Sequence, residues 1–263
     1  MKLPLFPPVS GRFVRVWQRN LTVYKKSWKV SFIPPLLEPL LYIAAFGLGL
    51  SGLIGDVSYQ GKAISYVDFV VPALLATTIM YNGFFETSYN SFVRMYYQKT
   101  FDAMMATPLT MPEIITGEIV WAATKSVLSA ALMLPVLSAF GLLSYPASLL
   151  TLPLSILGGL AFGATGMFFT SIVRGIETFN LPVFLFITPM FLFSGTFFPL
   201  DQLPAWAQGV ALFLPLTHLV LLARAATLGL WSAILPFSLL YLAVYTLVFF
   251  PLALTKMEKR LIK

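Results

Sequence analysis

The chain contains no cysteine, and His218 is its single histidine. The absence of cysteine excludes disulfides, thiolate metal sites and cysteine nucleophiles together. A hydrolase or transferase embedded in a membrane needs a paired acid and base or a set of metal ligands, and a histidine with no companion histidine or cysteine supplies neither. We therefore expect no catalytic residue, no metal site and no cofactor in this chain, and we expect it not to be an enzyme.

Charged residues are also scarce. They make up 10% of the 263 residues, whereas hydrophobic residues make up 58%, and the mean hydropathy is +0.85. A soluble domain carries about 25% charged residues, so the composition indicates an integral membrane protein. A membrane-spanning helix needs about 20 apolar residues, which leaves room for about six or seven spans. We expect residues 1–263 to form a single all-α polytopic transmembrane domain.

The remaining charge is mostly positive, with 17 Lys and Arg against 10 Asp and Glu and a net charge of +7. In such a hydrophobic chain, anionic lipid headgroups are a better counter-charge than nucleic acid. The opening MKLPLFPPVSGR has no uninterrupted apolar region and no small-residue cleavage site. It therefore predicts no cleaved signal peptide.

Residues 10–29 place aromatic and aliphatic side chains at helical spacing and basic side chains on another face. This pattern predicts an amphipathic helix in the membrane interface. The alternative is a disordered basic tail. The candidate interfacial residues are Arg12, Arg15, Trp17 and Arg19.

Hydrophobic segments predict six spans, with bounds 32–54, 66–85, 115–143, 149–172, 179–198 and 231–255. In the fourth span Gly159 and Gly163 form a GxxxG pattern, which indicates close helix packing. In the fifth, Pro182 and Pro189 predict local kinks.

The stretch 199–230 is hydrophobic, but Pro215 divides it into halves that are each too short to cross a bilayer. We expect two short re-entrant helices that dip into the membrane and return. The residues of interest in this motif are Phe198, Pro199, Pro215, His218 and Arg224. We interpret His218 as a polar group packed in the turn rather than as a catalyst.

Seven Lys and Arg precede the first span and four follow the last. The positive-inside rule places both ends in the cytoplasm, and only an even number of spans allows this. Six spans therefore fit better than seven, and the stretch 86–118 is then cytoplasmic.

This polar stretch is the longest interruption between hydrophobic segments. Residues 91–106 have helical character, Thr107 and Pro108 end it, and Thr110 with Glu113 forms a capping box for the next helix. We expect 91–106 to be a short cytoplasmic helix with Phe101, Met104 and Met105 on its exposed face, suited to a groove on a partner. The alternative is a helix that lies on the membrane. The candidate contact residues in this helix are Arg94, Lys99, Thr100, Phe101, Asp102, Met104 and Met105.

A carboxylate inside a span is costly and therefore a functional candidate. Glu38 falls in the first predicted span; the alternative is that it lies at headgroup depth near Lys26 or Lys29. The substrate-pathway candidates are Glu38, Tyr42, Phe85 and Glu86. If the protein were instead an ion-coupled secondary transporter, Glu38 and Asp68 would be its proton or ion sites.

A nucleotide-binding loop is missing. The stretch Gly55 to Ala63 superficially resembles one, but five residues separate its first two glycines and Ala63 follows Lys62. The motif needs four residues there and a hydroxyl after the lysine. If ATP drives this protein, another chain binds it.

Three motifs carry a family resemblance: KTFDAMMATPLTMPEIITGEI from Lys99, FLFSGTFFPLDQLPAWAQ from Phe191 and LPLTHLVLLARA from Leu214. Together they resemble the permease subunit of type-2 ABC exporters, and most closely the branch that includes the nodulation-factor (lipo-chitooligosaccharide) exporter permeases. The similarity covers nearly the whole chain in order and spacing.

The resemblance implies a homodimer of six-helix subunits in a bacterial inner membrane, with two separate cytoplasmic ATPase subunits that bind ATP and Mg. The helix 91–106 would be the coupling helix. It and the interfacial helix would contact those ATPases, and 199–230 would lie at the outer side. The implied substrate is an amphiphile: a lipid, a lipo-oligosaccharide or a drug-like molecule.

Overall fold

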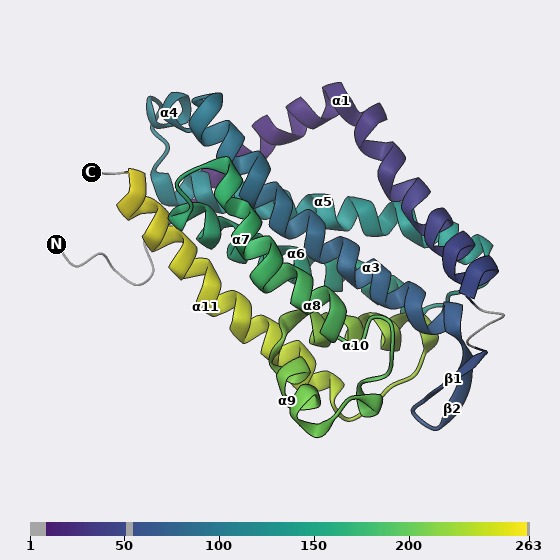
Figure 1. Cartoon of the computed structure of the whole chain (residues 1–263). Helices are drawn as coiled ribbons and strands as arrows, with labels where there is room; N and C mark the ends of the chain where they lie inside the picture. Colours follow the sequence, from purple (N-terminus) through teal and green to yellow (C-terminus); the bar gives the residue numbers. More distant parts are fainter. Residues whose placement is uncertain (1–8, 51–54, 262–263) are drawn as a thin grey trace.

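The computed structural model describes residues 9–50 and 55–261, and Figure 1 shows them as a bundle of long helices. The helices are α1 Phe13–Tyr42, α3 Tyr66–Phe85, α4 Thr100–Met105, α5 Met111–Ala139, α6 Thr151–Ile172, α7 Asn180–Pro182, α8 Thr188–Phe193, α9 Ala205–Phe213, α10 Pro215–Leu228 and α11 Leu235–Leu261. Two short strands, β1 Asp56–Tyr59 and β2 Lys62–Ser65, form a hairpin.

Six helical segments are long and apolar enough to cross a membrane, as expected. They are Ser31–Gly49, Tyr66–Tyr97, Met111–Ala139, Ala147–Ile172, Ile176–Phe193 and Leu235–Leu261. The last begins later and ends later than the predicted 231–255, and the fifth ends at Phe193 rather than at residue 198. Beyond Phe193 the chain turns at Gly195, whose φ of +72° favours glycine.

The expected separation between an interfacial helix and the first span is wrong. α1 is one continuous helix that contains Pro34, Pro35 and Pro39, and it runs on into a π-helical segment, Ile43–Leu50. Figure 1 shows α1 changing direction along its length, so that its first part lies across the bundle and its second part runs beside it. Residues 51–54 of the predicted first span lie outside the described residues.

The hairpin after the first span was not expected in an all-α chain. Gln60 and Gly61 both have positive φ, 52° and 74°, which is the geometry of a two-residue hairpin turn. Ser65 then caps α3: its Oγ accepts from the Asp68 backbone N–H at 3.2 Å and donates to the Asp68 carboxylate at 2.7 Å. Asp68 is thus part of a helix cap.

The predicted coupling helix 91–106 is not one helix. α3 continues through two π-helical turns, Glu86–Asn90 and Val93–Tyr97, and the chain then breaks at Lys99, which adopts left-handed backbone angles (φ 54°). Only Thr100–Met105 forms the separate helix α4. The next boundary is as predicted, because Thr110 and Glu113 form the capping box and α5 begins at Met111.

α6 packs closely on α3 and α5 through its glycines, as the GxxxG pattern indicated. A Cβ added at Gly159 would lie 2.6 Å from the Cα of Ala123 on α5, and one at Gly166 would lie 2.5 Å from the backbone oxygen of Phe84. Gly163 is less tightly enclosed, since the nearest atom would be 3.4 Å away. These contacts place α6 in the centre of the bundle.

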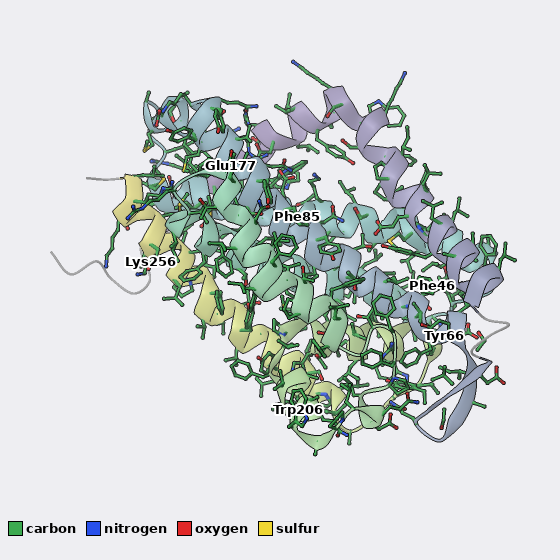
Figure 2. The ribbon with its side chains drawn as sticks, viewed as in Figure 1. Phe46, Tyr66, Phe85, Glu177, Trp206 and Lys256 are labelled. Atoms are coloured by element: carbon green, nitrogen blue, oxygen red, sulfur yellow. The ribbon has the colours of Figure 1, made fainter. Side chains whose placement is uncertain are left out.

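The stretch between the fifth and sixth spans forms two short helices that meet at Pro215, as predicted. The axes of α9 and α10 are bent by 87° relative to each other. They lie at the end of the bundle that carries the hairpin, and α4 and the end of α11 lie at the other end (Figure 1). Tyr66 and Trp206 mark the first end and Glu177 and Lys256 the second (Figure 2). A bend of this size fits both a broken span and a re-entrant pair, so the re-entrant arrangement stays a prediction.

Replacing Gly159 by Ala tests the central packing. The new methyl group would meet α5 backbone, which cannot move aside cheaply, so we expect a loss of roughly 1–3 kcal/mol of stability. The measurement is the apparent unfolding temperature of the purified protein in detergent. Gly163→Ala is the matched control and should stay close to wild type; equal behaviour of the two variants would contradict the packing described here.

Candidate functional site

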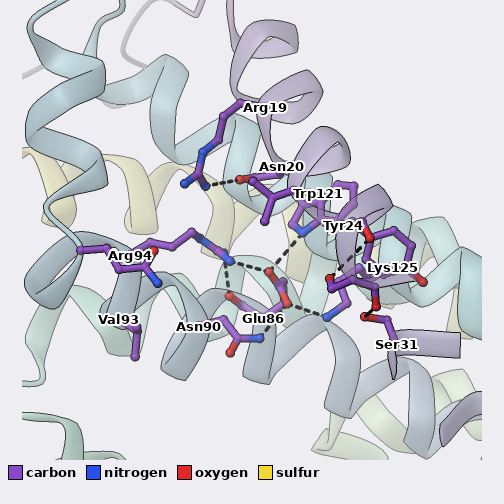
Figure 3. A pocket seen from close by; sticks show the side chains of 13 residues that line it. Arg19, Asn20, Tyr24, Ser31, Glu86, Asn90, Val93, Arg94, Trp121 and Lys125 are labelled. Atoms are coloured by element: carbon purple, nitrogen blue, oxygen red, sulfur yellow. Dashed lines mark hydrogen bonds and ion pairs between the residues drawn. The ribbon is translucent and has the colours of Figure 1, made fainter. Parts of the chain in front are cut away.

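A buried polar network joins the end of α3 to the first half of α5. Glu86, Asn90 and Arg94 follow one another at intervals of four residues on the helix that extends α3, and Glu118, Trp121 and Lys125 share one face of α5. Both carboxylates are almost fully buried, at 3% and 0% exposure. Figure 3 shows several of these side chains converging on Glu86.

Arg94 is the bridge of this network. Its guanidinium contacts Glu86 at 2.8 Å and Glu118 at 2.5 Å, and Lys125 Nζ lies 2.8 Å from the other oxygen of Glu86. Two cations therefore balance two carboxylates, which is the condition under which charges can be buried without a large penalty.

Neutral side chains fill the remaining hydrogen-bonding positions of the carboxylates. Trp121 Nε1 and Asn90 Nδ2 donate to Glu86 at 3.1 and 2.8 Å. Asn20 of α1 donates to Glu118 at 2.8 Å and Ser91 does so at 3.0 Å. The network therefore ties three helices, α1, α3 and α5, to one another.

A cavity of about 270 Å³ lies between α1 and this network. Its walls include Arg19, Tyr24 and Ser31 from α1 and Arg94 and Lys125 from the other two helices (Figure 3). Burial lowers the pKa of the Arg19 guanidinium, and nearby Glu118 opposes that shift. The cavity is polar, which is unusual for a surface between spanning helices.

A second cavity of about 290 Å³ shares part of this lining and extends it along α3; we call it the Glu38 pocket. It is lined by Glu38, Thr78, Tyr81, Asn82, Phe85, Glu86, Asn90 and Lys125. The Glu38 Oε1 atom accepts hydrogen bonds from the hydroxyls of Tyr42 and Thr78, each at 2.8 Å. The structure thus brings together all four substrate-pathway candidates: Glu38, Phe85 and Glu86 line the pocket, and the fourth, Tyr42, donates to Glu38.

Glu38 does not lie beside Lys26 or Lys29. Counted along α1, it is about 14 Å beyond Lys29 at about 1.5 Å per residue, and it bonds to Thr78 in the middle of α3. Glu38 falls within Ser31–Gly49, a segment that is long and apolar enough to cross a membrane. Glu86, in contrast, is fully engaged in the ion-pair network, so its role in the pocket is shared with holding α3 to α5.

The expectation that Phe101 is exposed is wrong. Phe101 is fully buried and packs in a hydrophobic cluster that includes Phe92 and Ile114, and Met104 and Met105 are half-buried against the same cluster. Thr100 is also half-buried. The outward-facing candidates are Lys99 and Asp102, whose side chains are 66% and 57% exposed and lie 4.0 Å apart. A six-residue helix on a hydrophobic chain needs such an anchor to stay in place, which explains the inward Phe101.

The beginning of α1 is clasped to the segment that follows α4. Arg12 donates to the backbone oxygen of Pro108 at 2.9 Å, Ser10 donates to Glu113, and Trp17 Nε1 donates to Thr124 at 2.9 Å. Val16 is buried against Gly117, where an added Cβ would be 2.5 Å away. The Arg15 side chain donates to Gln18 of α1 at 3.1 Å. The start of α1, α4 and the start of α5 therefore form one composite surface, which we call the coupling platform.

Sequence reasoning missed the exposed Tyr96 and Tyr97 beside this platform, and it did not assign Asn20, Trp121 or Glu118 to a site. A signal existed for the network: polar residues at intervals of three and four along two helices that otherwise face lipid or core. The exposure of the two tyrosines follows from the break at Lys99, which no composition pattern indicated.

At the opposite end, Arg224 is 2% exposed and has no carboxylate partner in the described chain. It donates to the backbone oxygens of Phe69 at 2.9 Å and Gly195 at 2.6 Å, and it lies 3.6 Å from the Phe69 ring centroid. Arg224 thus joins α10 to the start of α3 and to the loop after α8. Carbonyl dipoles and an aromatic face take the place of a counter-ion.

His218 is packed in the turn, in agreement with its interpretation from sequence. It bonds to Ser238 at 3.1 Å and to the Leu212 backbone oxygen at 2.8 Å, and it stacks on Tyr241 at 4.1 Å. Pro215 begins α10. Phe198 and Pro199 line a separate cavity of about 280 Å³ beside the hairpin. Within residues 9–50 and 55–261, no three His, Asp or Glu side chains converge as a metal site would require.

Arg94→Met tests the network. Removing the bridge leaves two buried carboxylates short of a partner, so we expect a loss of about 3–5 kcal/mol of stability. Adding Glu118→Gln to that variant removes one orphaned charge and should recover part of the loss. The measurement is the apparent unfolding temperature in detergent for both variants. If the double variant is no more stable than Arg94→Met, the pairing between Arg94 and Glu118 is not what stabilises this region.

Known proteins resemble the chain over most of its length. The ABC-2 type transporter family matches residues 12–228. The chain is 35% identical over 257 residues to Nodulation protein J of Rhizobium leguminosarum bv. viciae, covering 97% of this chain and 98% of that protein. Over 223 residues it is 39% identical to Nodulation protein J of Rhizobium leguminosarum bv. trifolii, covering 85% and 84%.

A more distant relative is the Inner membrane transport permease YadH of Escherichia coli (strain K12), 22% identical over 217 residues that cover 81% of this chain and 82% of that protein. The resemblance drawn from the three motifs is confirmed. With six segments able to span a membrane and the family match across both cavities and the coupling platform, this chain belongs to the ABC-2 type transporter family as a multi-pass permease subunit.

Proposed function

We propose that this permease is the transmembrane half of an ATP-driven exporter that moves an amphiphilic molecule, such as a lipid, a lipo-oligosaccharide or a drug-like compound, from the cytoplasmic side outward. Two copies of the chain form the transport pathway, and two separate ABC ATPase subunits bind ATP and Mg and hydrolyse the nucleotide. Family membership implies the ATPase partner. The permease itself is the non-catalytic component.

The observation that carries the proposal is the physical continuity between the coupling platform and the polar cavities. Phe101 locks α4 into the cluster that contains Phe92 of the α3 extension and Ile114 of α5. Arg94, five residues before Lys99, holds the wall of both cavities through Glu86. A displacement of α4 by a partner therefore moves the residues that shape the pathway, as a switch between two packed arrangements requires.

The distribution of charge supports a cytoplasmic position for the platform. The start of α1, α4 and the end of α11 lie at one end of the bundle (Figure 1), and Arg260 of α11 donates to the Val173 backbone oxygen at 2.5 Å at that end. Of the chain's 17 Lys and Arg, seven precede residue 32 and four follow residue 255. Under the positive-inside rule this end faces the cytoplasm, with both termini inside and α9 and α10 near the outer side.

The cavities suit an amphiphile. The Glu38 pocket combines carboxylate and amide groups with the stacked rings of Tyr81 and Phe85, whose centroids lie 5.6 Å apart. The surrounding helices are apolar and face lipid. A polar head group would occupy the cavities while its hydrocarbon tail stays beside the spans.

An ion-coupled secondary transporter is the alternative, with Glu38 and Asp68 as its ion sites. The Asp68 carboxylate is hydrogen-bonded to Ser65 in the cap of α3. Of the two acidic residues, Glu38 is therefore the remaining candidate for an ion site. Reconstitution of the chain with and without its cognate ABC ATPase separates the two functions. We expect transport only with the ATPase and ATP, and loss of that transport with vanadate; transport by the chain alone that vanadate does not affect would overturn the exporter proposal.

Asp102→Lys tests the coupling platform. Asp102 is exposed on α4, so reversal of its charge should leave the fold intact and weaken capture of the ATPase by at least about tenfold, the equivalent of about 1.4 kcal/mol. The measurement is co-purification of the ATPase with the tagged permease. Asp56→Lys, on the exposed hairpin at the other end of the bundle, is the matched control. Equal capture by both variants would place the docking surface elsewhere.

A further inference from the structure

The atoms of the Glu38 pocket that remain available to a ligand are mainly hydrogen-bond acceptors. Glu38 receives both of its hydrogen bonds on Oε1, and no described residue donates to its Oε2. Asn82 uses its amide N–H groups on the Thr78 backbone oxygen and on Ser129 Oγ, and Asn90 uses its amide on Glu86. The amide oxygens of both asparagines accept nothing from the described residues. Glu38 and Asn82 are half-buried and Asn90 is exposed, so these acceptors are accessible. A ligand that binds to them must supply hydrogen-bond donors, because on binding each acceptor exchanges its water for a ligand group.

The charged residues around the pocket also favour a ligand that supplies hydrogen-bond donors. Lys125 and Arg94 are the cations, and both are held by Glu86, with Glu118 as the second carboxylate on Arg94. These four charges balance. Glu38 adds a fifth charge, and it has no salt-bridge partner in the described part of the chain. Its hydrogen-bond donors are the hydroxyl groups of Tyr42 and Thr78. The charged residues that line the pocket itself, Glu38, Glu86 and Lys125, therefore carry one net negative charge, in a region where an uncompensated charge is expensive. Arg19 and Arg94 line the adjoining cavity.

Aromatic rings form another part of the wall. Tyr81 and Phe85 stack at 5.6 Å between centroids, and both line the pocket. The negative face of an aromatic ring attracts cations and is neutral toward uncharged groups, but it repels anions. Glu38 and this pair of rings therefore favour the same ligands.

We propose that Glu38 makes this pocket a charge filter for the head group of the transported amphiphile. The pocket binds head groups that donate hydrogen bonds and carry no negative charge, and a protonated amine binds most strongly because it meets the Glu38 carboxylate and the ring faces together. Anionic head groups, which include those of the anionic lipids around the protein, are rejected by like charge. This inference rests on the proposed export function, and it adds the class of head group that the pathway accepts.

The test uses three fluorescent amphiphiles with the same acyl chain and label, whose head groups are a primary amine, a neutral polyol and a carboxylate. ATP-dependent transport is measured in proteoliposomes that contain the permease and its cognate ABC ATPase. For the wild type we expect the amine and the polyol to be moved at least about tenfold faster than the carboxylate, the scale that one unit charge supports at a partly solvated site. Equal rates for all three would overturn the filter.

Glu38→Gln keeps the size of the side chain and removes its charge. We expect this variant to lose the preference for the amine and to move the carboxylate compound faster than the wild type does. Tyr42→Phe removes a hydrogen bond to Glu38 but leaves the charge, so it should keep the wild-type order. Glu177→Gln, an exposed acid at the far end of the bundle, is the control for a change in net charge. If Glu38→Gln keeps the wild-type order of transport rates for the three probes, Glu38 has a structural role and the filter is overturned.

Equilibrium binding of the same three probes to the permease in nanodiscs, without ATP, separates this inference from the export proposal. If the wild type binds the amine selectively and Glu38→Gln does not, the filter is supported even when no ATP-dependent transport is found. In that case only the export proposal fails.

If Glu38→Gln does not fold, Asn82→Asp adds a second negative charge to the same pocket and should strengthen the rejection of the carboxylate probe. Equal binding of amine and carboxylate to the wild type would overturn the filter, whatever the transport result.

Discussion

The ion pairs of Arg94 with Glu86 and Glu118 are the interaction on which the rest of the structure depends. Buried charges are tolerated between spanning helices only when each finds a partner, and here the partners come from different helices. Arg94 and Glu86 belong to the extension of α3, and Glu118 and Lys125 belong to α5. Asn20 adds α1. The need to satisfy these groups fixes how the three helices lie relative to one another.

Close packing on the other side of α3 and α5 complements that constraint. The glycines of α6 let its backbone approach α5 at Ala123 and α3 at Phe84, so α6 fills the space behind the network. Polar pairing on one face and glycine contacts on the other leave little freedom for the central helices.

The same network borders the two cavities, so it connects them physically to the coupling platform. The coupling platform is anchored through Phe101 and through the clasp of α1 on Pro108. The Glu38 pocket begins at Glu86, which Arg94 and Lys125 hold. The proposed coupling to a separate ATPase rests on this contact, because a partner that shifted the platform would act on both cavities through these side chains.

Much of the fold could be read from the amino-acid order alone, because the physical causes are local. Runs of apolar residues determine six spans, Thr110 and Glu113 determine where α5 begins, Pro215 divides α9 from α10, and the motif from Lys99 identifies the family. Of the site, sequence supplied the candidate residues Glu38 and Glu86, since a carboxylate within a span is conspicuous by itself.

The tertiary structure decided what those residues contact. The pairing of Glu86 with Lys125, 39 positions later, the burial of Phe101 and the capping role of Asp68 depend on neighbours or backbone angles that composition does not encode. The hairpin at Gln60 and the left-handed break at Lys99 are likewise single backbone conformations rather than patterns. Sequence by itself thus determined which segments enter the membrane, because hydrophobicity is additive along the chain. Only the packing of the helices decided which charged side chains form ion pairs with one another and which, like Glu38, remain available to a ligand.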